Sequence, residues 1–269
     1  MSVLDVKNIS IVFGGLKAVT NFNLALEKGE LVGLIGPNGA GKTTVFNMLT
    51  GVYNPTSGNI LLNRADNRPD KKVEYVSIVG KKPFQITQMG IGRTFQNIRL
   101  FKNLSVLDNV RIAFHFNAGY NALQSILRTP RYYAREEEIR QKSIELLKIF
   151  NIQDKAEELA MNLPYGEQRK LEITRALATN PRVLLLDEPA AGMNPQETHD
   201  LMNLIHFIRE KFNLTILLIE HDMSLVMGIC ERITVLDYGQ TIAMGTPAEI
   251  SRDPKVIKAY LGDGGELGA

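Results

Sequence analysis

The sequence predicts an α/β fold built on a largely parallel sheet. The first indication is an uncharged apolar run, Leu31–Ile35, of the kind that forms a strand buried on both faces. Similar runs follow at Val183–Leu186, Thr215–Ile219 and Ile233–Leu236. Apolar residues at helical spacing fill Pro195–Phe212, between two of these runs. Two neighbouring parallel strands must be joined by a crossover connection, usually a helix, so the order strand, helix, strand predicts a parallel pair.

The helix expected at Pro195–Phe212 has a complete start signal. Asn194 is a suitable N-cap, Pro195 suits the first helical position, and Glu197 completes a capping box. Its apolar face consists of residues three or four apart: Leu201, Leu204, Ile205, Ile208 and Phe212.

The N-terminal region has a different pattern. Leu4 and Val6 alternate with polar residues, and so do Phe22 and Leu24, with Gly14-Gly15 between the two stretches. Alternation predicts strands with one wet face, so we expect N-terminal antiparallel strands beside the parallel core.

The middle of the chain is predicted to be helical, because no buried-strand pattern occurs from about 105 to 178. Ala134–Phe150 carries opposite charges four residues apart, as in Glu136–Arg140 and Glu138–Lys142, which indicates a solvated helix face. We therefore expect one domain over 1–269, with a helical subdomain inserted into an α/β core. The expected bounds are 1–98 and 179–250 for the core, 99–178 for the insert, and 251–269 for a C-terminal extension. Residues 64–84 are expected to form an exposed loop or small hairpin.

Composition excludes several classes of protein. The 269 residues are 44% hydrophobic and 22% charged, which rules out low-complexity disorder and collagen-like repeats. A net charge of +2 argues against binding nucleic acid by electrostatics alone. The single cysteine excludes an internal disulfide and a cysteine-based zinc site. No apolar run reaches the roughly 20 residues that a membrane-spanning helix needs.

A phosphate-binding loop follows the first buried run. Its pattern has glycines at fixed positions and ends in Lys-Thr-Thr: Gly36, Pro37, Asn38, Gly39, Ala40, Gly41, Lys42, Thr43 and Thr44. Glycines let successive N–H groups turn toward one anion, and the following helix adds the positive end of its dipole. Lys42 is expected to reach the β- and γ-phosphates, and the Thr43 hydroxyl to hold Mg²⁺.

Two acidic residues end a later buried run. Asp187 and Glu188 follow Val183–Leu186, and ligands of open α/β sheets bind at the carboxyl ends of the strands. We expect Asp187 to bind Mg²⁺, through water, and Glu188 to polarise or deprotonate the attacking water.

The next motifs resemble those of ATP-binding cassette (ABC) ATPases. Leu163–Arg169 (LPYGEQR) is similar to the LSGGQ-type signature, Gln96 resembles the family's Q-loop residue, and His221 resembles its switch histidine. Phe13 lies where the family places an aromatic that stacks on adenine. These elements occur in the family's order over most of the chain.

The resemblance implies an ABC-type phosphate-loop ATPase that uses ATP and Mg²⁺. Glu188, His221 and Gln96 would be catalytic, and Thr43, Gln96 and Asp187 would hold the metal. It also implies a head-to-tail dimer in the ATP-bound state. In such a dimer one subunit's phosphate loop and the other's signature residues enclose the nucleotide. The signature residues here are Tyr165, Gly166, Glu167 and Gln168.

Longer stretches resemble Liv-type ATP-binding subunits of branched-chain amino acid importers. They include GIGRTFQNIRLFKNLSVLDNV and GTPAEISRDPKVIKAYLG. This resemblance implies two membrane permeases, a second ATP-binding subunit and a solute-binding protein as partners. It also implies a peripheral location at the cytoplasmic face of the membrane, and no nucleic acid partner.

Two residues depart from the usual family pattern. Pro164 replaces the signature serine, whose hydroxyl caps the signature helix and contacts the γ-phosphate in trans. Proline can do neither, and losing a hydrogen bond to a charged group costs about 1.5–3 kcal/mol. In a heterodimer Pro164 would face the partner's nucleotide. We therefore expect two unequal ATP sites, with faster hydrolysis of the nucleotide on this chain's own phosphate loop. Asn194 replaces a common aspartate, and its role as a helix cap accounts for it.

Alternatives remain within and outside transport. The ATPase of lipopolysaccharide export shares the Tyr-Gly style of signature, but its family is shorter and lacks the LRTP…EEEIRQKSIELL segment. A non-transport ABC ATPase of the iron–sulfur assembly type matches this chain in size, and only the Liv-like stretches distinguish this chain from that type.

Overall fold

The computed structural model describes residues 1–63, 74–115 and 128–261. The chain divides into two compact units. Met1–Arg93 and Arg182–Ala269 form the first, which we call the strand-rich unit; Thr94–Pro181 forms the second, the helical unit. The helical segment expected at about 99–178 lies inside the helical unit.

A four-stranded antiparallel sheet in the strand-rich unit has the order β2-β1-β4-β5. Its strands are β1 (Ser2–Phe13), β2 (Leu16–Glu27), β4 (Ser57–Asn63) and β5 (Tyr75–Ser77). β1 and β2 alternate buried and exposed residues along much of their length, as expected for strands with one wet face. The expected N-terminal antiparallel strands are thus confirmed.

A second sheet of six strands has the order β10-β9-β3-β8-β7-β6. Neighbouring pairs from β9 to β6 are parallel, and only β10 is antiparallel to its neighbour. The bounds are β3 (Leu31–Ile35), β6 (Ile91–Arg93), β7 (Val183–Asp187), β8 (Thr215–Ile219), β9 (Arg232–Asp237) and β10 (Gln240–Gly245). Every residue of β3, β7 and β8 is buried, which explains their uninterrupted apolar sequences. The fold class predicted from the sequence is confirmed.

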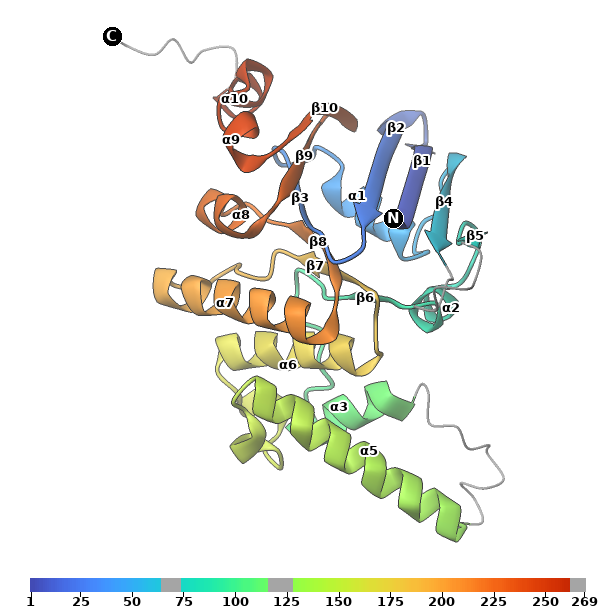
Figure 1. Ribbon diagram of the computed structural model, residues 1–269, viewed down its shortest axis with the longest axis vertical. Helices are drawn as coiled ribbons and strands as arrows, with labels where there is room; N and C mark the ends of the chain where they lie inside the picture. Colours follow the sequence, from blue (N-terminus) through green and yellow to red (C-terminus); the bar gives the residue numbers. More distant parts are fainter. Residues whose placement is uncertain (64–73, 116–127, 262–269) are drawn as a thin grey trace. The chain divides into compact units, whose positions relative to one another are not determined.

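Helices pack on these sheets (Figure 1). They are α1 (Lys42–Leu49), α2 (Pro83–Gln88), α7 (Pro195–Phe212), α8 (Met223–Ile229), α9 (Pro247–Ile250) and α10 (Pro254–Leu261). α7 has the bounds and the capping box that the sequence predicts: the Asn194 side chain accepts from Glu197 N, and the Glu197 side chain accepts from Asn194 N. Local signals thus mark where this helix begins.

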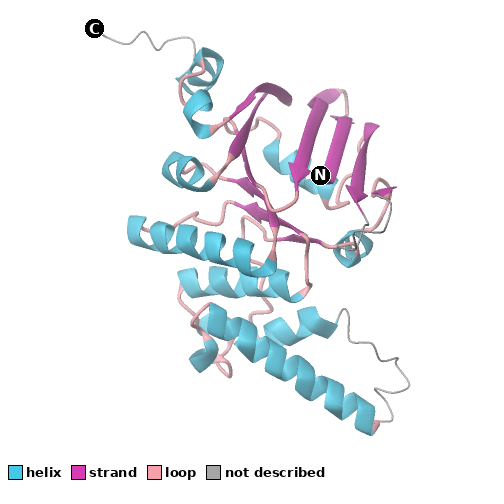
Figure 2. Cartoon of the chain, in the orientation of Figure 1, coloured by secondary structure: helices cyan, strands magenta, loops and turns pink. Residues whose placement is uncertain are grey.

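The helical unit contains α3 (Val106–His115), α5 (Pro130–Ile149) and α6 (Tyr165–Ala178). Two short 3₁₀ turns, Gln153–Lys155 and Ala160–Asn162, lie between α5 and α6. Figure 2 shows helices and loops in the described part of this unit. An isolated antiparallel bridge joins Ser105 and Leu159. α5 begins before the charged stretch that predicts it, because Thr129 caps it and Pro130 occupies its first turn.

Part of the segment 64–84 can be described. β5 pairs antiparallel with β4, which agrees with a small hairpin, and α2 begins at Pro83. Residues 64–73 of that segment lie outside the described residues. Over the described ranges, no helix is both long and apolar enough to cross a membrane.

Candidate functional site

The loop between β3 and α1 has a backbone that requires glycine. Gly36, Gly39 and Gly41 have φ angles of 148°, 80° and 101°. A Cβ on Gly36 would lie 2.0 Å from Leu236 O, and one on Gly41 would lie 2.8 Å from Ala18 O. Any larger residue at Gly36 or Gly41 would displace main chain, so these two positions set the course of the loop.

The start of α1 offers unused donors. Gly41 is the N-cap, no side chain caps the helix, and the first turn has no acidic residue. Within the described residues, the N–H groups of Lys42, Thr43 and Thr44 have no backbone acceptor. Such donors, with the helix dipole behind them, form an anion site.

Lys42 folds back over this loop. Its Nζ donates to Gly36 O at 2.6 Å and to Pro37 O at 2.9 Å, and the residue is only 6% exposed. Burial lowers the pKa of Lys42, while the charges of Glu188 and Asp187 act in the opposite direction. The ammonium group thus contacts two carbonyls of the loop, and the two carboxylates act on it electrostatically.

The carboxylates end strand β7. Asp187 is 1% exposed. Glu188 has a φ of 47°, in the left-handed region, and its N–H donates to Ile219 O at 2.9 Å. A left-handed conformation is strained for glutamate, and strain of this kind is concentrated at functional sites. The turn directs the Glu188 side chain toward the end of β8.

His221 meets Glu188 there, with 2.8 Å between His221 Nε2 and Glu188 Oε1. Glu220 fixes the intervening turn, because its carboxylate accepts from Ala190 N at 2.7 Å and from His221 N at 3.0 Å. Burial raises the pKa of Glu220, although these N–H groups lower it in part. The sequence does not single out Glu220, because an acidic residue after a strand usually belongs to a solvated turn.

Phe13, predicted to contact adenine, ends β1 and is 42% exposed. Its ring lies edge-on to Tyr53, with 5.1 Å between the ring centroids. An exposed aromatic edge pair can accept a flat ring by stacking. The role of Phe13 stays a prediction.

Gln96 and the signature residues belong to the helical unit, where the buried Arg169 links them. Arg169 Nη1 donates to Phe95 O at 2.7 Å, and Nη2 donates to Gln96 O at 2.9 Å. Arg169 also pairs with Glu172 at 2.7 Å, and Glu172 accepts from Phe95 N at 3.3 Å. Burial raises the pKa of Glu172, while the Arg169 charge lowers it. The main chain around Gln96 is thus tied to the signature helix.

The signature helix α6 begins as the sequence implies. Pro164 is its N-cap, and no side chain caps the helix. The N–H of Gln168 donates to Pro164 O at 3.0 Å, and the Gln168 side chain donates to Leu163 O at 2.8 Å. Glu167 pairs with Lys155, and Tyr165 is 46% exposed. The first turn keeps donors for an anion even without a serine.

The sequence did not predict two contacts near the phosphate loop. Burial raises the pKa of Tyr260, from the C-terminal α10, and an interaction with the backbone of Gly36 lowers it in part. Arg93, from β6, pairs with Asp187 at 2.8 Å. Both contacts join residues far apart in the chain, so no local pattern could reveal them.

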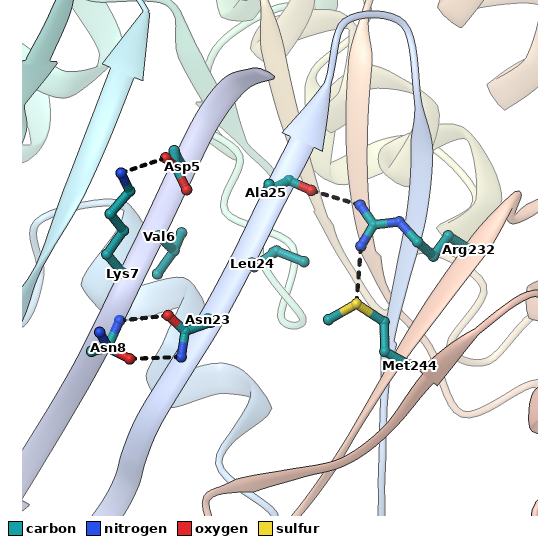
Figure 3. A pocket seen from close by; sticks show the side chains of 9 residues that line it. All are labelled: Asp5, Val6, Lys7, Asn8, Asn23, Leu24, Ala25, Arg232 and Met244. Atoms are coloured by element: carbon teal, nitrogen blue, oxygen red, sulfur yellow. Dashed lines mark hydrogen bonds and ion pairs between the residues drawn. The ribbon is translucent and has the colours of Figure 1, made fainter. Parts of the chain in front are cut away.

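A shallow hollow elsewhere in the strand-rich unit is not a second candidate site (Figure 3). Its polar groups bind one another: Asn8 and Asn23 exchange hydrogen bonds of 2.9 Å, and Arg232 donates to Ala25 O at 2.6 Å. None of the residues predicted to bind nucleotide lines it.

The residues of the strand-rich unit fit a magnesium nucleotide. The loop glycines leave room for an anion, the first turn of α1 supplies donors, and Lys42 adds a cation. The Thr43 hydroxyl and the Asp187 carboxylate are oxygen ligands of the kind that Mg²⁺ prefers. The arrangement defines a phosphate-loop nucleotide-binding protein, with a glutamate and a histidine in contact at the ends of two neighbouring strands.

Comparison with known proteins identifies the family. The ABC transporter family matches residues 19–191, more than half of the chain, and a family described as branched-chain amino acid ATP-binding cassette transporter matches residues 240–266. The chain therefore belongs to the ABC transporter family and is an ABC ATPase.

Relatives match nearly the whole chain. The high-affinity branched-chain amino acid transport ATP-binding protein LivG of Escherichia coli K12 is 47% identical over 97% of this chain and 98% of its own. BraF of Pseudomonas aeruginosa, described in the same terms, is 45% identical over the same shares. The lipopolysaccharide export system ATP-binding protein LptB of Escherichia coli is 34% identical over 98% of both chains. The ADP conformation of MJ1267, an ATP-binding cassette of an ABC transporter, has a TM-score of 0.81 and 31% identity. The match covers 98% of this chain and 100% of MJ1267.

Proposed function

We propose that this chain is the ATP-binding and ATP-hydrolysing subunit of an importer for branched-chain amino acids. The observation that supports the transported class is the 47% identity with LivG over almost the full length of both chains. The observation that supports the chemistry is the contact of Glu188 with His221, beside the loop that carries Lys42.

Hydrolysis is assigned to residues of the strand-rich unit. The donors at the start of α1 and Lys42 hold the phosphates, and Phe13 stacks on adenine. Glu188 accepts a proton from the attacking water, and His221 holds the Glu188 carboxylate in place. Thr43 and Asp187 of this unit, together with Gln96 of the helical unit, would hold Mg²⁺, which would neutralise charge on the phosphates.

The signature acts on a second subunit. Tyr165, Gly166, Glu167 and Gln168 contact nucleotide held by the partner's phosphate loop, so ATP closes the dimer. The strand-rich unit acts as the core lobe and the helical unit as the inserted subdomain. The subdomain and the Gln96 region contact two membrane permeases, a solute-binding protein completes the complex, and the chain lies at the cytoplasmic face of the membrane.

Lipopolysaccharide export is the runner-up, supported by the 34% identity with LptB. The higher identity with LivG, 47%, favours the importer. The same identity with LivG favours the importer over a non-transport role in iron–sulfur assembly.

Affinity purification of the tagged chain from its native membranes tests the assignment. We expect hydrophobic permease subunits and a second, different ATP-binding subunit in stoichiometric amounts. A soluble stoichiometric partner in place of permeases would overturn the transport role. Recovery with components of a lipopolysaccharide exporter would favour the runner-up.

A further inference from the structure

Arg93 contacts the acidic end of β7 from the neighbouring strand. Its Nη2 lies 2.8 Å from Asp187 Oδ2, and the two side chains are only 7% and 2% exposed. β6 and β7 are parallel, with Arg93 opposite Leu185, so Arg93 reaches forward along the sheet to Asp187. The pair is buried beside residues predicted to hold a metal.

The same guanidinium also binds the helix that follows the phosphate loop. Arg93 Nη1 donates to Asn47 Oδ1 at 2.8 Å and to Thr50 Oγ1 at 3.2 Å. The guanidinium carbon lies 5.5 Å from the centroid of the Phe46 ring. One planar group therefore joins α1, which begins with Lys42 and Thr43, to the carboxylate of Asp187.

Stability alone is a weak explanation for this arrangement. A buried ion pair loses about as much in desolvation as it gains in attraction, so apolar residues of similar volume often stabilise as well. What a planar guanidinium supplies is orientation, because its donors have fixed directions. Here it fixes the direction of Asp187 relative to α1.

We propose that Arg93 is a positioning residue for the metal site, holding Asp187 at a fixed place relative to the Thr43 end of α1. This inference rests on the proposed function, which assigns Thr43 and Asp187 to Mg²⁺. Side chains that orient metal ligands in this way raise metal affinity about 10- to 100-fold. Arg93 is also the last residue of the strand-rich unit, three residues before Gln96.

Mn²⁺ binding to ATP-loaded protein tests the proposal without turnover. Excess protein in a Glu188→Gln background would be loaded with ATP, and free Mn²⁺ followed by its electron paramagnetic resonance signal. Arg93→Met should weaken Mn²⁺ binding at least about tenfold. ATP affinity in EDTA should stay within about threefold, since the loop donors are unchanged. Arg93→Lys should be intermediate, because one ammonium cannot span Asp187 and α1.

Control variants separate positioning from folding. Arg232→Met removes another arginine ion pair of the same unit, with Glu30, and should leave Mn²⁺ binding unchanged. Asn47→Ala and Thr50→Val keep both charges but release the guanidinium from α1, and each should weaken Mn²⁺ binding.

Unchanged Mn²⁺ affinity in Arg93→Met would overturn the inference, and so would an equal fall in metal-free ATP affinity. If Arg93→Met does not fold, unchanged binding in both Asn47→Ala and Thr50→Val overturns it. Absence of ATP-dependent Mn²⁺ binding in the parent would instead refute the proposed function.

Discussion

His221 Nε2 lies 2.8 Å from Glu188 Oε1, across the ends of two adjacent parallel strands. Asp187 is paired with Ile219 in that ladder, so Glu188 and His221 leave the sheet at the same edge. The imidazole therefore fixes the carboxylate that we assign as the base. A glutamate held by this histidine in a strained turn has few alternative directions.

Replacing the base should separate binding from turnover. Glu188→Gln keeps the shape and the contact with His221 but removes the proton acceptor, so we expect a loss of about 10²- to 10⁴-fold in turnover. ATP binding should persist, and the closed dimer should accumulate with ATP. Phosphate release and size-exclusion chromatography measure the two effects. Glu210→Gln, on the exposed face of α7, is the control. Undiminished hydrolysis in Glu188→Gln would refute the role of Glu188.

The Arg169–Glu172 pair should be important for the helical unit. Arg169→Met leaves the Glu172 carboxylate buried without its charge partner, which costs about 3–5 kcal/mol. Urea unfolding measures the loss. The double variant Arg169→Met/Glu172→Gln should recover part of it, because no buried charge remains. A loss below about 1 kcal/mol in the single variant would contradict this account.

The N-cap of α6 offers a test of the asymmetric dimer. Pro164→Ser supplies a capping hydroxyl, which should stabilise the helix by about 1 kcal/mol and raise hydrolysis at the partner subunit's site. Turnover of the assembled complex measures the effect. Pro164→Ala is the matched control, because alanine cannot cap and should give no rise. Equal turnover in the parent and Pro164→Ser would exclude the asymmetry.

The buried Cys230 should report unfolding. Burial raises the pKa of its thiol from 9.0 to about 12. Because the folded state binds the proton more tightly than the unfolded state, stability should fall as pH rises above about 9. At pH 8 an alkylating reagent should modify Cys230 only at the rate of opening, and urea should accelerate the reaction sharply. Rapid modification of folded protein at pH 8 would contradict the burial.

Local patterns in the sequence predict much of this molecule. The phosphate loop, the strands that flank it and the capped α7 need only short-range signals, and all three are present. β6 was not predicted, because three residues, Ile91–Arg93, are too few to show a pattern. Its Arg93 contacts a residue 94 positions away, and such a contact depends on strand order rather than on spacing.

Contacts of buried charged and polar residues likewise depend on the fold rather than on local sequence. Arg169 lies in a motif that the sequence singles out, yet its contacts with Phe95 and Gln96 arise only when α6 packs under that loop. Tyr260 lies in the C-terminal extension, and only the folded chain brings it to Gly36. The predicted residues of the strand-rich unit, Lys42, Asp187, Glu188 and His221, come together because parallel strands end at one edge.

Reconstitution tests the central claim most directly. The chain would be purified with its permeases and second ATP-binding subunit, placed in lipid vesicles, and supplied with the solute-binding protein. We predict ATP hydrolysis that rises when the binding protein carries leucine, isoleucine or valine, accompanied by uptake of that amino acid. Glu188→Gln should abolish both. Hydrolysis that continues unchanged with or without the loaded binding protein, and no uptake, would contradict the account.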